Sequence, residues 1–155
     1  MDKQKERSLR IFSSLKVSKL PFNIKEDNYS NLGKIISEFF YFVSNVRNGN
    51  ASLKWCFANI KRTKIFLQIF TANEENRETY KEEIAKNISE YSYKTIAKII
   101  DEGLARGYYV ALEVDGNPSR DSKIKNIRPS EDLIISFLNL SIDIIHYIDS
   151  KKMRP

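Results

Sequence analysis

The sequence predicts a mainly α-helical fold that carries one small β-hairpin. Apolar residues recur at three- and four-residue spacing in several segments, which is the period of an amphipathic helix. One short run, 108–114, is rich in β-branched and aromatic residues and is followed by a turn and an alternating segment, which is typical of a hairpin. With 155 residues, of which 41% are hydrophobic, the chain can build the packed core of one ordinary domain.

The N-terminal part is expected to comprise a basic arm and two helices. Residues 1–27 form the arm, which can be either a frayed helix or disordered; its first 25 residues hold seven basic residues against two acidic ones. A helix is predicted over about 28–47, where apolar residues keep a helical spacing up to the turn Asn48-Gly49-Asn50. A second helix is predicted over roughly 52–71 by the same criterion. We treat residues 28–155 as a single domain.

Two shorter helices are predicted next, in the region of about 80–106. Thr79 followed by Glu82 has the spacing of a capping box, so a short helix should run from Tyr80 to about residue 87. After a polar turn, another helix begins near Ser92, and Gly107 is well placed to end it as the C′ residue.

The hairpin and a last helix complete the order. Strand 108–114 leads into the turn 115–119, and residues 123–127 alternate polar and apolar as the returning strand should. Pro129 stops that strand, and Ser130 can cap a helix that reaches about residue 150.

The charge distribution indicates a polyanionic partner. The formal net charge is +6, and the stretch 120–128 holds four basic residues against one acid, Asp121. The basic residues there are Arg120, Lys123, Lys125 and Arg128. A basic hairpin of this kind suits contact with phosphate or with the minor groove of DNA, although edge lysines that discourage aggregation would look the same.

The helix that begins near Ser92 has a core side and a polar side. A rotation of 100° per residue places Ile96, Ile99 and Ile100 together on the core side. The outer surface near its start carries groups that can donate to base edges or phosphate: Tyr91, Tyr93, Lys94, Thr95 and Lys98. An ordinary solvated helix face with two lysines is the alternative reading.

Three fragments resemble the MarR-type winged helix-turn-helix regulators. Residues 95–107, TIAKIIDEGLARG, are similar to the family's recognition helix, T-V-T-R-I-V-D-x-L-x-x-x-G. Residues 84–88, IAKNI, resemble its L-A-x-x-L, and residues 121–131, DSKIKNIRPSE, resemble its D-x-R-x-K-x-I-x-P-T-E. The resemblance implies a winged helix with a helix-turn-helix at about 80–106, a wing at about 108–128, and dimerisation helices at about 28–47 and 131–150.

The resemblance also implies a function. Such regulators bind pseudo-palindromic DNA as dimers, and many respond to a small-molecule effector. In this chain, Lys94, Thr95 and Lys98, with Tyr91 and Tyr93, would lie at the major groove. The wing residues Arg120, Lys123 and Lys125 would contact phosphate or the minor groove. The fragments depart from the family at Lys123, which replaces an arginine, at Ala97 and Lys98, and at Gly103, where a leucine is expected.

The last helix favours a homodimer. Apolar residues cover nearly its whole circumference between Leu133 and Ile148, and a small monomer hides only one stripe of a peripheral helix. A central helix wrapped by its own chain is the alternative. Polar residues interrupt this stretch and make it short of a membrane span, and the N-terminus lacks the apolar core of a secretory signal. We therefore expect a cytoplasmic protein without a membrane partner.

The remaining residues offer no catalytic or metal chemistry. The chain contains none of the common phosphate-binding, zinc-protease or nucleophile-elbow motifs, and its single Cys56 and single His146 exclude a multi-thiolate zinc site and leave no histidine pair for a metal. Cys56 and His146 are interpreted as packed residues, with a redox-sensing thiol as the lesser alternative for Cys56. Either core packing or an effector pocket explains the aromatic set Phe39, Phe40, Tyr41, Phe42, Trp55 and Phe57.

The sequence thus predicts a sequence-specific, double-stranded DNA-binding transcriptional regulator that is neither an enzyme nor dependent on a cofactor. The alternative is a winged-helix module that binds a protein partner and does not bind DNA.

Overall fold

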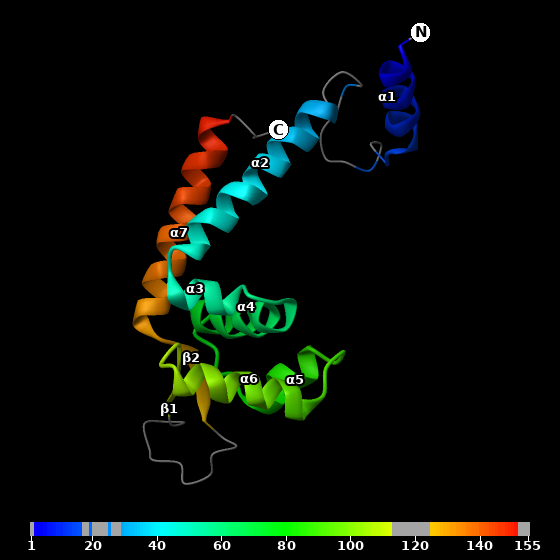
Figure 1. Cartoon of the computed structure of the whole chain (residues 1–155). Coiled ribbons are helices and arrows are strands. Elements are labelled where there is room, and N and C mark those ends of the chain that lie inside the picture. Colours follow the sequence, from blue (N-terminus) through cyan, green and yellow to red (C-terminus); the bar gives the residue numbers. More distant parts are fainter. Residues whose placement is uncertain (1, 17–18, 20–24, 26–28, 113–124, 152–155) are drawn as a thin grey trace. The chain divides into compact units, whose positions relative to one another are not determined.

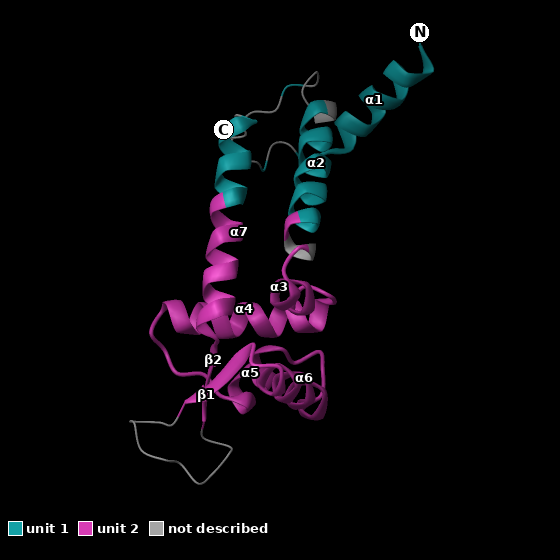
Figure 2. Ribbon diagram, turned by 60° about the vertical axis from the view of Figure 1, so that its left-hand side comes forward, with its two compact units in different colours: residues 1–45, 143–155 teal, residues 46–142 magenta. Residues whose placement is uncertain are grey.

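The computed structural model describes residues 2–16, 19, 25, 29–112 and 125–151 (Figure 1). Within these residues the chain forms seven helices and one two-stranded antiparallel sheet, so the mainly α fold with a small hairpin is confirmed. The structure divides into two compact units, residues 1–45 with 143–155 and residues 46–142 (Figure 2). Each unit is described separately below.

Unit 1 contains α1 (Lys3–Ser14), most of α2 (Tyr29–Asn48) and the last turns of α7 (Glu131–Ser150). The Asp2 side chain accepts a hydrogen bond from the Gln4 amide and caps α1, which buries no residue. Residues 3–14 of the basic arm are therefore helical, while most of 17–27 lies outside the described residues. In this unit the Tyr147 ring stacks on Phe42, with centroids 4.6 Å apart.

Unit 2 holds the remaining elements. They are α3 (Ala51–Cys56), α4 (Ile60–Glu74), α5 (Lys81–Asn87), α6 (Tyr93–Ala105), β1 (Tyr109–Leu112), β2 (Asn126–Pro129) and the first turns of α7. β1 and β2 are antiparallel, with Tyr109 opposite Pro129 and Leu112 opposite Asn126. Within this unit α3 and α4 form one layer, and α5 and α6 lie together below it in the view of Figure 1.

The single helix predicted over 52–71 is wrong, because the chain forms two helices there. α3 ends at Cys56 and α4 begins at Ile60. The Asn59 side chain accepts a hydrogen bond from the Arg62 amide at 2.9 Å, which is the N-cap that starts α4. Asn50 caps α3 in the same way through the Leu53 amide.

The core of unit 2 lies between α4 and the other elements. Its most buried side chains come from α4 (Ile65, Phe66, Ile69), the α5 region (Ile84, Ile88), α6 (Ile96, Ile100), the strands (Tyr109, Ile127) and α7 (Leu133, Leu140). Phe137 of α7 joins this core, since its ring centroid lies 5.1 Å from that of Phe66 and 4.6 Å from that of Phe70. The first turns of α7 are thus an integral part of unit 2.

The predicted capping box at Thr79 is also wrong. Tyr80 occupies the N-cap of α5, but its side chain forms no capping hydrogen bond, and Thr79 is 2% exposed. The backbone of Thr79 instead pairs with β2. Its amide donates to Asn126 Oδ1 at 3.0 Å, and its carbonyl accepts from the Ile127 amide at 2.9 Å. Thr79, two residues before α5, is therefore held by the hairpin.

The predicted boundaries of α6 and the start of α7 are confirmed. The Ser92 side chain caps α6 through the Thr95 amide, and Gly107 ends it at φ +75°. The Tyr108 amide donates to the Gly103 carbonyl at 2.9 Å and the Gly107 amide to the Leu104 carbonyl at 3.1 Å, the hydrogen bonds of a Schellman motif. Ser130 caps α7 through the Leu133 amide.

Candidate nucleic-acid interface

The outer face of α6 carries two exposed lysines. Ile96 and Ile100 are fully buried on the opposite side of the helix. Lys94 and Lys98 are one turn apart, and both are exposed. Tyr93, in the first turn, is 48% exposed, and its hydroxyl lies 3.5 Å from Glu82 Oε1 on α5. The first two turns of α6 thus present cationic and phenolic groups to solvent.

The acidic residues of α6 are matched by cations from other helices. Lys81 Nζ of α5 lies 2.5 Å from Asp101 Oδ1, and Arg62 Nη2 of α4 lies 3.5 Å from Glu102 Oε2. Lys94 and Lys98 form no ion pair with any described residue. The two lysines are therefore available for an anion from outside the chain.

Two predicted site residues have contacts within the protein. Thr95 Oγ1 lies 2.9 Å from Ser92 Oγ, so that its hydroxyl belongs to the N-cap of α6. The Tyr91 ring is half-buried, and Lys61 Nζ of α4 lies 5.2 Å from its centroid, in a cation–π arrangement. The sequence gives no signal that connects Lys61 with this site, because 30 positions separate it from Tyr91.

The hairpin residues fall partly outside the described chain. Arg120 and Lys123 lie there, so that the structure describes neither. Lys125 directly precedes β2 and is half-buried. Arg128, in β2, has a buried Nε atom without a hydrogen-bond partner among the described residues.

Gly103 lies where α6 packs closely on β1. A Cβ atom at this position would lie 2.2 Å from Cδ2 of Tyr109 and 3.3 Å from Cη2 of Trp55. Both rings are buried, at 1% and 6% exposure. The Tyr109 ring thus occupies the space that a side chain at position 103 would need, and the glycine permits close packing of α6 on β1.

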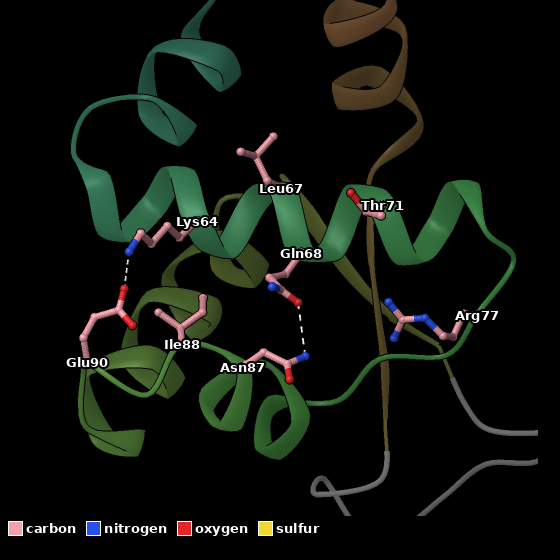
Figure 3. Close-up of a pocket in the computed structure, with 8 residues that line it drawn as sticks. All are labelled: Lys64, Leu67, Gln68, Thr71, Arg77, Asn87, Ile88 and Glu90. Atoms are coloured by element: carbon pink, nitrogen blue, oxygen red, sulfur yellow. Dashed lines mark hydrogen bonds and ion pairs between the residues drawn. The ribbon is translucent and has the colours of Figure 1, made fainter. Parts of the chain in front are cut away.

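A shallow groove of about 560 Å³ lies between α4 and the turn after α5 (Figure 3). Its charged side chains are already paired. Lys64 binds Glu90, which raises the pKa of Lys64 and lowers the pKa of Glu90 through their hydrogen bond. Arg77 Nη1 lies 2.5 Å from Glu83 Oε1. A second groove, of about 480 Å³, is lined by parts of α3, the α6 end and the start of α7.

Neither groove is lined by the aromatic residues considered for an effector pocket. Trp55 is buried beside Tyr108 and Tyr109, and the Phe57 ring packs against Phe66. In unit 1, Phe39 and Phe42 contact Tyr147. Packing accounts for these four rings, whereas Phe40 and Tyr41 are exposed.

Cys56 has the environment of an unreactive thiol. Its side chain is fully buried, and burial raises the pKa of the thiol from 9.0 to about 12. The thiolate is the reactive form of cysteine, and it is scarce at neutral pH in such a site. In the described part of the chain no three His, Cys, Asp or Glu residues come together as a metal site would require.

One helix in the described part of the chain, α7, is long and apolar enough to cross a membrane. α7 has 20 residues, so the expectation that this stretch is shorter than a membrane span is wrong. Phe137 of this helix contacts Phe66 and Phe70, whereas Leu133 and Leu140 are its only buried residues.

Comparison of the chain with protein-family models, with curated protein sequences and with solved structures gave no match. The function below is therefore argued from the geometry of the chain itself.

Proposed function

We propose that unit 2 is a winged helix-turn-helix domain and that the chain binds double-stranded DNA as a homodimer to regulate transcription. Two helices joined by a short turn, α5 and α6, precede an antiparallel hairpin. The hairpin is hydrogen-bonded to Thr79, immediately before the helix pair, which supports a fixed orientation of wing and helices. This order of elements supports the proposal of a winged helix.

One observation carries the proposal. On α6 the acids Asp101 and Glu102 have cationic partners from α5 and α4, whereas Lys94 and Lys98 have none among the described residues. A duplex phosphate or a guanine edge is an anion or acceptor that fits these ammonium groups. We assign to α6 the role of the helix that enters the major groove.

The other proposed contacts follow from their position. Tyr93 adds a hydroxyl beside Lys94, and Lys61 with Tyr91 adds a cation at the turn before α6. The Thr95 hydroxyl belongs to the N-cap of α6. Its proposed contribution to DNA binding is to fix the position of the first turn of α6. Arg120, Lys123 and Lys125 remain the proposed wing contacts with phosphate or the minor groove.

The homodimer is proposed to form through α2 and α7. Both helices expose large apolar side chains that a monomer would leave in water. On α2, Phe40 is 66% and Tyr41 72% exposed. Pairing of two copies would bring two α6 helices to one duplex, as a pseudo-palindromic site requires.

The test is DNA binding by fluorescence anisotropy, with a duplex selected from a random library and with a random duplex. Lys98→Ala should weaken binding to the selected duplex by about 1–3 kcal/mol if Lys98 contacts a base. An equal loss on both duplexes would make Lys98 a phosphate contact. Lys54→Ala, at an exposed lysine of α3, is the matched control and should bind as the unaltered protein does. Binding that does not weaken with added salt, or is unchanged in Lys98→Ala, would contradict the proposal.

A second candidate is a winged-helix module that binds a protein partner. Asp101 favours it, because its carboxyl side chain is 59% exposed on the same face as Lys98 and would repel phosphate. For such a module, a mobility-shift assay at low and high salt should show little retardation of random duplex at either concentration.

A further inference from the structure

The exposed side of α7 carries an apolar stripe with the spacing of a two-helix coiled coil. Its members are about half exposed: Ile135 (50%), Leu138 (44%), Ile142 (50%) and Ile145 (54%). They are separated by three, four and three positions, which places them on one side of a continuous helix. Leu133 and Leu140, which are 0% and 3% exposed, lie off this stripe and pack into the core. The stripe has no cover within the described chain.

The intervals between these four residues, three, four and three positions, are the same in either direction along the helix. If two copies of α7 are laid antiparallel, Ile135 of one meets Ile145 of the other, and Leu138 meets Ile142. The four apolar layers then match without a gap, and the two-fold axis passes close to Asn139. A self-complementary surface of this kind is what a two-fold symmetric dimer requires.

A polar edge runs beside the stripe and is complementary in the antiparallel arrangement. Asp132, Asn139 and His146 follow one another at seven-residue intervals, and all three are exposed. Antiparallel pairing places Asp132 of one copy beside His146 of the other at both ends, with the two Asn139 side chains together in the middle. In a parallel pair these three residues of the two copies would instead lie on opposite edges of the interface, so that Asp132 would not meet His146 of the other copy.

We infer that α7 pairs antiparallel with α7 of a second copy of this chain, through the Ile135–Ile145 stripe and the Asp132, Asn139 and His146 edge. The inference rests on the homodimer of the proposed function and specifies its helix, its direction and its residues. A lipid surface would match the apolar stripe, but the regular polar edge along the same exposed side argues for a protein helix.

The first experiment measures self-association by sedimentation velocity on the full chain without DNA. Ile142→Asp puts a charge into the middle of the apolar layers and should raise the dimer dissociation constant at least about tenfold. Ile60→Asp introduces the same charge at an isoleucine of α4 that is 60% exposed and should leave that constant unchanged. Far-UV circular dichroism checks that both variants keep their helices. A monomeric wild type, a dimer insensitive to Ile142→Asp, or binding of the monomer to phosphatidylcholine vesicles would overturn the inference.

The second experiment tests the direction of pairing by disulfide cross-linking. Asp132→Cys and His146→Cys copies are mixed and oxidised. The mixture should give a cross-linked dimer, because the two cysteines are adjacent in the antiparallel pair. Each variant alone should give none, since the equivalent positions then lie about 21 Å apart, fourteen residues at 1.5 Å each. Cross-linking of either variant with itself and not in the mixture would overturn the inference. Because no DNA is present, this outcome is independent of whether the chain binds DNA.

Discussion

Replacing Gly103 with alanine tests how closely α6 is packed on the hairpin. The new Cβ would lie 2.2 Å from Cδ2 and 2.6 Å from Cε2 of Tyr109, whereas carbon atoms pack at about 3.5–4.0 Å. Neither Tyr109 nor Trp55 can turn into solvent, because both rings are buried. Alanine is favoured over glycine within a helix by about 1 kcal/mol, but overpacking of a core costs about 1–3 kcal/mol and more for a deep clash. We expect a net loss of about 2 kcal/mol in the free energy of unfolding.

Thermal unfolding followed by circular dichroism measures this loss. For a chain of this size about 1 kcal/mol shifts Tm by roughly 2–4 °C, so Gly103→Ala should lower Tm by about 4–8 °C. Gly33→Ala is the matched control, since a Cβ at this glycine of α2 meets nothing within 4 Å, and it should not lower Tm. In a Tyr109→Ala background, Gly103→Ala should no longer destabilise. A rise in Tm for Gly103→Ala in the unaltered chain would refute the reasoning.

Two further predictions concern ionisable groups. Burial raises the pKa of the Cys56 thiol from 9.0 to about 12, so the unfolded chain loses this proton at lower pH than the folded chain does. The stability that this difference contributes is complete below pH 9 and is lost between pH 9 and about 12, by up to about 1.4 kcal/mol per pH unit. Urea unfolding across this range should show a smaller slope against pH in Cys56→Ala, and an equal slope would contradict the assignment. Asp101→Asn removes an exposed negative charge from the outer face of α6 and frees Lys81, so it should strengthen binding to random duplex in the anisotropy assay. Weaker binding would show that the Lys81–Asp101 ion pair positions the interface.

Local signals in the sequence predicted those features that depend on neighbouring residues. Ser92 and Ser130 each cap the helix that follows, and Gly107 has the positive φ of a helix end. The rotation of α6 was likewise predictable, since Ile96 and Ile100 are buried while Lys98 is exposed. In each case the deciding interaction spans no more than a few positions of the chain.

The features that the sequence did not predict depend on distant residues or on a competing local cap. The apolar spacing continues through Phe57 and Ile60 and conceals the break between α3 and α4, which the Asn59 cap produces. Thr79 fits a capping box, but β2, 47 positions later, takes its backbone groups.

The same limit applies to the candidate site. The ring of Tyr109 lies against Gly103 from across the Schellman turn, and Lys61 reaches Tyr91 from another helix. Spacing within one segment contains no information on such pairs.

The position of Phe137 in the core of unit 2 has a consequence for biosynthesis. The unit starts at Val46, yet Phe66 and Phe70 remain without this ring until the ribosome has released the chain beyond Leu140. A nascent chain that lacks the start of α7 leaves an open aromatic surface on α4 and lacks the buried Leu133 and Leu140 as well. Final compaction of unit 2 therefore requires that the start of α7 has left the ribosome, and until then the nascent chain exposes aromatic surface of the kind that chaperones shield.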